Sequence, residues 1–247
     1  MNLKESFSYL KNGEKWYINF LIGSVIVLLI LGDSFYSSVH QSFLPVSKGY
    51  EVTMFIVNCV VIFLSIILNG YDISNTHNLI HTETNQCLSW KSFNHILKSG
   101  FVAIGAYILY YLPIMLLGIF FIYILYARHT EIGMIMSIVS LLTPFVIAIL
   151  LLFNLIITCS FVTDLKFISF FQYKKMYELI KNNKKGFLIL LLFTAVFAGI
   201  NQLCFVTIKT FPYLLLPLAA VVSFYLLLVK SSIMATFVKQ STETISE

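Results

Sequence analysis

The sequence predicts an all-α protein that crosses a membrane several times. Of its 247 residues, 59% are hydrophobic and only 11% are charged, and the mean hydropathy is +0.89. A soluble domain carries about 25% charged residues, so this chain has too little polar surface to cover a water-soluble globule. Six windows contain no Asp, Glu, Lys, Arg or His, and each predicts one membrane-spanning helix. They are residues 16–32, 52–71, 99–127, 132–163, 186–208 and 210–229.

The lengths of these windows constrain the predicted helices. A bilayer crossing takes about 20 apolar residues, and window 16–32 just meets the lower limit. Windows 99–127 and 132–163 are longer than one straight crossing and too short for two. We expect them to tilt, to kink at Pro113 and Pro144, or to project beyond the bilayer. No Ala-x-Ala-like cleavage site follows the first window, so we expect a retained helix there and not a signal peptide.

The distribution of basic residues predicts the topology. Of the 16 lysines and arginines, 13 lie in the amino-terminal tail, in segments 72–98 and 164–185 and after residue 229, and three lie in the alternate loops. Cytoplasmic loops carry the excess of Lys and Arg, so both termini are predicted to be cytoplasmic in a multi-pass protein of the cell membrane. The basic excess thus reports topology and attraction to anionic headgroups, and it does not indicate nucleic-acid binding.

A short motif recurs three times on the predicted cytoplasmic side. Its copies are Leu10-Lys11-Asn12-Gly13, Leu97-Lys98-Ser99-Gly100 and Ile180-Lys181-Asn182-Asn183. Each copy ends an amphipathic stretch and precedes an apolar window. This order predicts three repeats of a surface helix, a hinge and a transmembrane hairpin, at about residues 1–71, 88–163 and 170–230. Residues 1–238 are predicted to form a single transmembrane domain, and the polar tail 239–247 is predicted to be disordered in the cytoplasm.

Two of the amphipathic stretches, around residues 90–98 and 173–181, are candidate surfaces for lipid or a cytoplasmic partner. Each has an apolar stripe and a basic face, which is typical of helices at the headgroup boundary. The candidate contact residues are Trp90, Lys91, Lys174, Lys175, Lys181, Lys184 and Lys185. In the alternative interpretation, these helices only connect spans and rest on the underside of the protein itself.

Amides and hydroxyls are the polar groups expected at membrane depth, and the main candidates are Asn58, Asn154, Asn201 and Gln202. The simpler interpretation is that these amides form interhelical hydrogen bonds, because an unpaired amide in lipid is costly. The alternative is a polar pathway. The same choice applies to Tyr107, Tyr110 and Tyr111, which either line a cavity or act as packing and interface anchors. Because the windows lack ionisable residues, a self-sufficient proton-coupled pump is not expected.

No pattern in the sequence indicates catalysis. Walker A, dinucleotide-binding, His-Glu-x-x-His and Gly-x-Ser-x-Gly motifs are all missing, so we predict a protein that is not an enzyme and has no cofactor. One metal-like cluster exists, consisting of His77, His81, Glu83 and Cys87. Neighbouring Asn and Thr residues favour a solvated loop at that segment, and no metal site is predicted there.

Several motifs together resemble a known family. Their order along the chain is Trp16, Gly70-Tyr71, Leu88-Ser89-Trp90, Gly100 and Leu112-Pro113. This order resembles the bacterial and archaeal membrane proteins grouped as domain of unknown function 4013, over roughly residues 1–230. Ser89 stands where family members often have proline. The resemblance implies a multi-pass membrane protein with no established activity, and it transfers no catalytic residue.

Two functions remain open at this point. The first is a permease-like subunit of a transport system that works with a separate ATPase in the export of, or immunity to, a peptide or amphipathic compound. The second is a non-transporting membrane scaffold, a lipid-interacting protein or a standalone immunity protein. The candidate partners are the lipid bilayer with its anionic headgroups, an ATPase subunit and a second copy of the chain.

Overall fold

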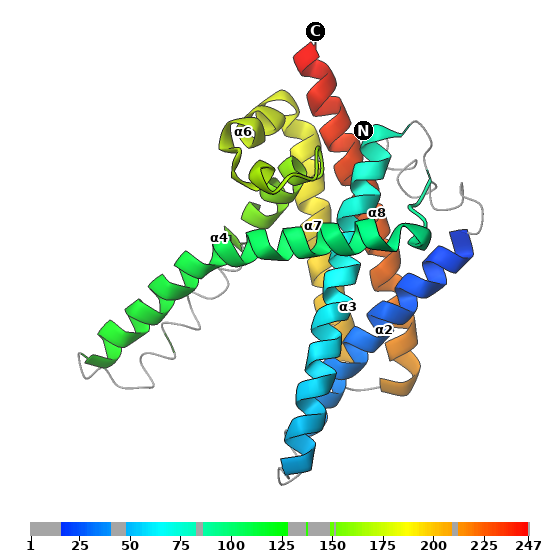
Figure 1. The fold of residues 1–247 in the computed structure, drawn as a ribbon, viewed down its shortest axis with the longest axis vertical. Helices are drawn as coiled ribbons and strands as arrows, with labels where there is room; N and C mark the ends of the chain where they lie inside the picture. Colours follow the sequence, from blue (N-terminus) through cyan, green and yellow to red (C-terminus); the bar gives the residue numbers. More distant parts are fainter. Residues whose placement is uncertain are drawn as a thin grey trace.

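The computed structural model describes residues 16–40, 48–82, 86–127, 137, 149–150, 152–208 and 212–246. Every regular element in these ranges is helical, which confirms the all-α prediction (Figure 1). The elements are α2 (Trp16–His40), α3 (Lys48–His81), η2 (Trp90–Ser92), α4 (Phe93–Ala127), η3 (Phe167–Phe171), α6 (Tyr173–Asn182), α7 (Lys184–Ile208) and α8 (Pro212–Ser246). A short apolar helix, Leu152–Phe161, precedes η3.

Five of the described helices are long and apolar enough to cross a membrane. Their apolar stretches are Trp16–Asp33, Val52–His81, Trp90–Ile124, Lys184–Leu203 and Leu215–Glu243. The predicted fourth span, 132–163, is described only in part, and its described end is the helix Leu152–Phe161. Large apolar side chains such as Leu21, Phe55 and Leu117 are exposed on the outside of these helices, as expected of surfaces that face lipid. The chain is therefore a polytopic helical membrane protein.

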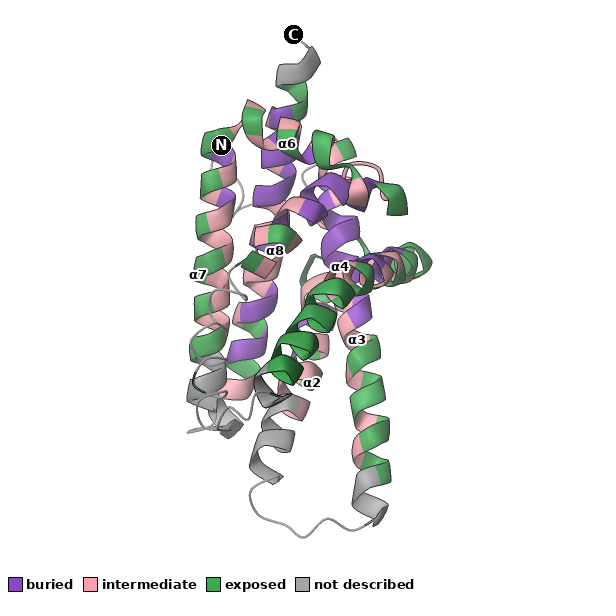
Figure 2. Cartoon of the chain, turned by 90° about the vertical axis from the view of Figure 1, so that its left-hand side faces the viewer, coloured by how far each residue is buried: buried purple, intermediate pink, exposed green. Residues whose placement is uncertain are grey.

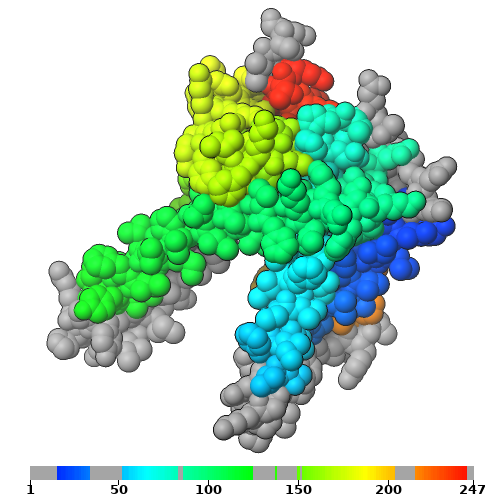
Figure 3. Space-filling view, in the orientation of Figure 1, coloured from blue at the N-terminus to red at the C-terminus, as the bar shows by residue number. Residues whose placement is uncertain are grey.

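Helix α8 forms the centre of the bundle. In the most apolar 18-residue window of α8, 61% of the residues are buried inside the protein, against 17% or less in the corresponding windows of the other four helices (Figure 2). A helix that is apolar on all sides is suited to burial, and α8 packs against α2, α3, α6 and α7. By contrast, the carboxyl-terminal half of α4 is exposed and stands apart from α2 and α3 (Figure 3).

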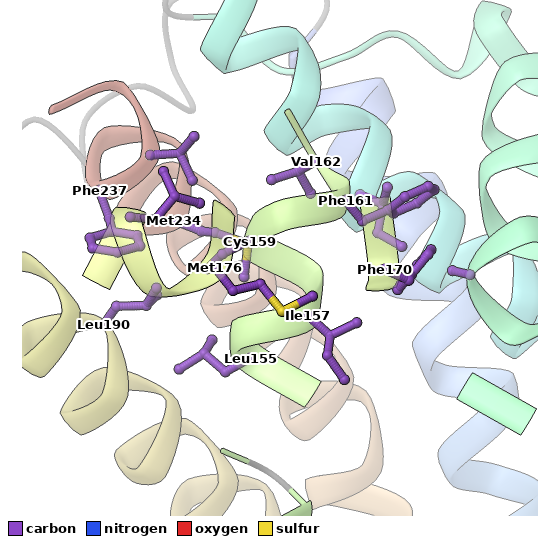
Figure 4. Close-up of a cluster of buried hydrophobic side chains, with 14 of the residues drawn as sticks. Leu155, Ile157, Cys159, Phe161, Val162, Phe170, Met176, Leu190, Met234 and Phe237 are labelled. Atoms are coloured by element: carbon purple, nitrogen blue, oxygen red, sulfur yellow. The ribbon is translucent and has the colours of Figure 1, made fainter. Parts of the chain in front are cut away.

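Two hydrophobic clusters meet along α8. One surrounds the helix Leu152–Phe161, whose buried side chains pack with residues of α6, α7 and α8 (Figure 4). Met176, Leu190 and Phe237 represent these three helices in the cluster. The other cluster joins α2, α3 and the start of α4 to α8, with Phe224 at its centre. These clusters fix α3, α7 and the helix Leu152–Phe161 around one side of α8.

Gly70 and Gly100 allow α3 and α4 to cross in close contact. A Cβ atom added at Gly70 would collide with the carbonyl oxygen of Ile96, and one added at Gly100 with that of Ile66. Helix α4 runs without interruption from Phe93, through Gly100 and beyond. The separate surface helix and hinge predicted for the second repeat are therefore wrong, because Gly100 serves tertiary packing and not a turn.

The third repeat has the predicted hinge. Helix α6 ends at Asn182, Asn183 leaves the helical conformation with φ −139°, and α7 begins at Lys184. The Asn183 side chain accepts a hydrogen bond from the backbone N–H of Gly186 at 2.8 Å, and so caps the start of α7. The first copy of the motif, at residues 10–13, lies outside the described residues.

The predicted disorder of the tail is wrong for its described part. Helix α8 continues through residue 239 to Ser246, and Ser241 is buried. The Ser241 hydroxyl donates to the carbonyl of Phe237 at 2.7 Å, and the Asn182 side chain donates to the Ser241 carbonyl at 3.3 Å. Contact with α6 therefore orders a segment whose composition alone favours disorder.

The segment 72–81 is also helical, and the loop predicted there is wrong. Residues of α3 after Tyr71 are mostly buried and contact the segment that follows the helix Leu152–Phe161. His77 Nδ1 donates to the Val162 carbonyl and His81 Nε2 donates to the Thr163 carbonyl, each at 2.7 Å. Lys239 of α8 donates to the Thr82 carbonyl at 3.3 Å. Segments predicted to share one side of the membrane thus meet at one end of the molecule.

Candidate functional site

The central feature of the site is an ion pair between α3 and α8. Lys230 Nζ lies 2.5 Å from Asp72 Oδ2, and the two side chains are 18% and 7% exposed. Both residues belong to helix stretches that are long and apolar enough to cross a membrane, Val52–His81 and Leu215–Glu243. Charged side chains at such positions are costly, face the interior of the bundle and mark functional sites in membrane proteins.

The local sequence gives the Asp72 carboxylate a second partner. Ser231 follows Lys230 on α8, and its hydroxyl donates to Asp72 Oδ1 at 2.5 Å. Lys230 and Ser231, which are consecutive on α8, thus each donate a hydrogen bond to one oxygen of the Asp72 carboxylate. Helix α3 continues past Asp72, where the Thr76 hydroxyl donates to the Asp72 carbonyl at 2.8 Å. Both carboxylate oxygens are therefore hydrogen-bonded, which a buried charge requires.

A cavity of about 280 Å³ lies beside this ion pair. It is bordered by α3, α4, the helix Leu152–Phe161, α7 and α8, and eight of its twelve lining residues are polar. The lining residues are Asn69, Asp72, Tyr107, Asn154, Leu155, Thr158, Thr194, Phe197, Ala198, Asn201, Lys230 and Met234. A space of this size and polarity holds several water molecules or a small polar solute.

Hydrogen bonds fix one wall of the cavity. Thr158 donates its single hydroxyl proton to the Asn154 carbonyl at 2.7 Å. The Tyr107 hydroxyl lies 2.9 Å from Thr158 Oγ1, and so Tyr107 must be the donor in that bond. On α7, the Thr194 hydroxyl donates to the Leu190 carbonyl at 2.8 Å. The helix Leu152–Phe161 and α7 therefore each contribute a threonine to the lining of the cavity.

The structure brings two of the four predicted amides to the cavity. Asn201 accepts a hydrogen bond from the Ser223 hydroxyl of α8 at 2.6 Å and also lines the cavity, so both interpretations of this residue apply. Asn154 lines the cavity from the helix Leu152–Phe161. Asn58 and Gln202 are exposed on the outside of α3 and α7, and neither lines it.

The three tyrosines of α4 have different positions. Tyr107 lines the cavity, as described above. Tyr110 donates to the Phe170 carbonyl at 2.5 Å and its ring stacks on Phe171, so it anchors η3 to α4. Tyr111 stacks on Tyr107 with ring centroids 6.3 Å apart. The cavity interpretation thus holds for Tyr107, and the packing interpretation holds for Tyr110.

Most of the predicted basic contact residues are on the surface. Lys91, Lys174, Lys181, Lys184 and Lys185 are exposed. Lys175 differs, because its ammonium lies 3.4 Å from Asp164 Oδ2 and donates to the Thr163 hydroxyl. Helix α6 buries Met176 and Leu179, so it rests on the protein itself as the alternative interpretation states.

Trp90 makes its contacts inside the protein. Its ring stacks on Tyr71 with centroids 4.2 Å apart and planes inclined by 15°. The indole Nε1 donates to the carbonyl of Asn19 at 2.9 Å. Trp90 thus connects η2, which directly precedes α4, to both α2 and α3.

Sequence reasoning missed Asp72 and Lys230, because α3 and α8 continue beyond the predicted windows and include both residues. Each residue stands directly beyond an apolar window, at 71 and at 229, and a charge-free criterion ends the helix just before it. One available signal was the spacing of Asn69, Asp72 and Thr76, which places three polar side chains on one face of a continued helix.

The fold and the site define a multi-pass helical membrane protein with a polar, charged cavity between its helices. The sequence model of the family described as Protein of unknown function (DUF4013) matches residues 53–209, which is more than half of the chain. The chain therefore belongs to this family, and the resemblance inferred from its motifs is confirmed. The match includes Asp72 and ends before Lys230, and Trp16 also lies outside it. No curated protein and no solved structure matches the chain.

Proposed function

We propose that the chain is the membrane-embedded subunit of a transport system and that the cavity beside Asp72 and Lys230 forms part of the path of the solute. The buried ion pair carries this proposal. A purely structural contact between α3 and α8 would be at least as stable if it were apolar, because burying two charges costs more than their attraction usually returns. A charged pair on the wall of a polar cavity is, in contrast, suited to a solute that must leave water.

The size of the cavity limits what can occupy it. Pockets for drug-sized ligands measure about 300–1,000 Å³, and this cavity measures about 280 Å³. It therefore suits a small solute, or one residue at a time of the peptide or amphipathic compound that the sequence analysis considered. We propose no catalytic role for the lining residues.

The proposal includes a separate ATPase and the predicted topology. Both termini would lie on the cytoplasmic side of the cell membrane, where the exposed lysines of α6 and the start of α7 are available to a soluble subunit. The sequence analysis did not expect a proton-coupled pump, because the predicted spans lack ionisable residues. Asp72 of α3 and Lys230 of α8 weaken that argument, so coupling to an ion gradient must also be tested. The experiment must therefore compare the two sources of energy.

Inside-out vesicles from cells that produce the chain provide the test. The vesicles are incubated with a small-molecule extract of the same cells, with ATP, with a proton gradient or with neither, and the trapped solutes are identified by mass spectrometry. At least one solute should accumulate with the native chain and not with Asp72→Asn. Asp164→Asn is the matched control, because Asp164 pairs with Lys175 away from the cavity. Equal contents in all vesicles would exclude transport, and accumulation with the proton gradient in the absence of ATP would exclude the need for an ATPase.

A second function, a lipid-interacting scaffold, is supported by the outer face of α6. Tyr173 and Tyr177 are 60% and 66% exposed, and the exposed Lys174 and Lys181 lie on the same short helix. Exposed aromatic and basic side chains together suit the headgroup region of an anionic leaflet. If this function holds, replacing the exposed lysines with glutamine should abolish cellular activity while the solute content of the vesicles stays the same.

A further inference from the structure

The two members of the ion pair differ in how fully they are hydrogen-bonded. Asp72 uses both carboxylate oxygens, one toward Ser231 and one toward Lys230. An ammonium group has three N–H donors, and within the described part of the chain Lys230 uses one of them, on Asp72. Lys230 is also the more exposed of the two, at 18% against 7%. The cationic member therefore has unused hydrogen-bonding capacity at the cavity.

The amides of the cavity add further donors. Asn154 Oδ1 lies 3.2 Å from Thr158 Oγ1, whose proton the Asn154 carbonyl takes, and Asn154 Nδ2 has no hydrogen-bond partner among the residues that the structure describes. The Asn201 Oδ1 atom is likewise occupied by Ser223, and its Nδ2 uses one of two protons on the Phe197 carbonyl at 3.0 Å. In both amides at least one N–H donor is left for a ligand, and in Asn201 the acceptor is already engaged.

We infer that the cavity binds a small solute through a carboxylate group, with Lys230 exchanging the Asp72 carboxylate for that of the solute. This inference rests on the proposed function, because it names the class of solute for the same cavity. The unused N–H groups of Lys230, Asn154 and Asn201 supply what a carboxylate needs, since its oxygens only accept hydrogen bonds.

Ser231 makes the exchange of partners feasible. When Lys230 turns to the solute, Asp72 keeps the hydrogen bond from the Ser231 hydroxyl to Oδ1. The buried carboxylate is then not left without a donor, which is the costly outcome of breaking a buried pair. A cationic solute has no equivalent route, because it would displace Lys230 from Asp72, and the ammonium group of Lys230 has no other hydrogen-bond partner within the described part of the chain.

Charged thiol reagents measure this preference directly. Thr194→Cys places a thiol on the cavity wall, and its modification is followed by mass spectrometry of the peptide that contains residue 194. The reagents are anionic sulfonatoethyl, cationic trimethylammonioethyl and neutral methyl methanethiosulfonate, each rate being divided by the rate with a free thiol. Ala198→Cys, also on the cavity wall, serves if Thr194→Cys does not fold. Val196→Cys is the control, because Val196 is exposed on the outer side of the same helix.

We expect the anionic reagent to modify residue 194 at least about tenfold faster than the cationic one, because the unused N–H groups of Lys230, Asn154 and Asn201 attract an anion, and electrostatic attraction in a cleft changes rates by at least this order. Lys230→Met should reverse the preference, and Val196→Cys should show none. Sodium acetate should slow the modification of Thr194→Cys relative to acetamide, and this protection should disappear with Lys230→Met.

The outcomes separate the inference from the proposed function. Modification by all three reagents without preference for the anion, or without protection by acetate, overturns the inference and leaves an accessible cavity for transport. No modification at residue 194 or 198 by any reagent, the neutral one included, shows that the cavity is closed to solutes and overturns both.

Discussion

Lys230 Nζ and Asp72 Oδ2 lie 2.5 Å apart although 158 positions separate the two residues in the chain. The pair joins α3, which crosses α4 at Gly70 and Gly100, to α8, which forms the centre of the bundle. It thus connects the two hydrophobic clusters of the protein beside its polar cavity. An interaction at this position is expected to affect both stability and function, and the two effects can be measured separately.

Removing one member of the ion pair should destabilise the protein more than removing both. Asp72→Asn and Lys230→Met should each lower the free energy of unfolding by about 3–5 kcal/mol, because each leaves one buried charge without its partner. The double variant should lose clearly less than the sum of the two. Chemical unfolding in detergent micelles, followed by circular dichroism, measures these differences.

The Asp164–Lys175 pair is the matched control for this cycle. Its members are each 32% exposed and their charged atoms are 3.4 Å apart, so the same replacements there should cost at most about 1 kcal/mol. If the losses at Asp72 and Lys230 were simply additive, the two residues would not act as a pair in the folded protein.

The close contact between α3 and α4 should not tolerate a methyl group. Gly100→Ala should lower stability by about 1–3 kcal/mol, because the added Cβ meets the backbone carbonyl of Ile66 and the helices must move apart. Gly105→Ala is the control on the same helix, since a Cβ there meets nothing within 4 Å. It should leave stability unchanged or raise it by up to about 1 kcal/mol. Thermal unfolding of the purified variants distinguishes the two, and equal losses at both positions would mean that the helices do not cross at Gly100.

Hydropathy was enough to predict the membrane class and the approximate spans, because these depend on composition along a single helix. It could not place Asp72 or Lys230, because the partner that makes each charge tolerable inside a helix lies far away in the sequence. The same limit explains Gly100. Local sequence favours a hinge at this glycine, whereas its contact with Ile66 of α3 requires a residue without a side chain in a continuous helix. At Asn183 the local rule was sufficient, because the cap is made within three residues.

The cavity was predictable in its residue types and not in its location. Asn154 and Asn201 stood out as amides in apolar windows, and both line the cavity. Asn58 and Gln202 stood out for the same reason, but both are exposed on the outside of the protein. The sequence could not separate the two groups, because the inner face of a span is unknown until its neighbouring helices are known. Only the packing of α3, α7 and the helix Leu152–Phe161 around α8 separates these two groups.

Trp90 should be needed for the stability of the fold. Trp90→Phe keeps the aromatic stack on Tyr71 but loses the hydrogen bond to the Asn19 carbonyl, at a cost of about 1 kcal/mol. Trp90→Ala loses the stack as well and should cost about 3–5 kcal/mol. Thermal unfolding in detergent provides the measurement, with Trp16→Phe as the control because Trp16 is exposed. Equal melting temperatures for the native chain and Trp90→Ala would contradict the internal role assigned to this indole.

The lysines around α6 should divide into two groups by their effect on lipid and on stability. Glutamine at the exposed positions 174, 181, 184 and 185 should reduce the anionic phospholipid that copurifies with the protein and leave its unfolding unchanged, because each exposed lysine near an anionic leaflet contributes about 1 kcal/mol. Lys175→Gln should leave the bound phospholipid unchanged and lower the stability by at most about 1 kcal/mol, since Lys175 is held by Asp164 and Thr163. Native mass spectrometry of bound phosphatidylglycerol and thermal unfolding report the two effects independently. If Lys175→Gln alone removed as much lipid as the four exposed replacements together, the division between a surface group and an internal lysine would be wrong.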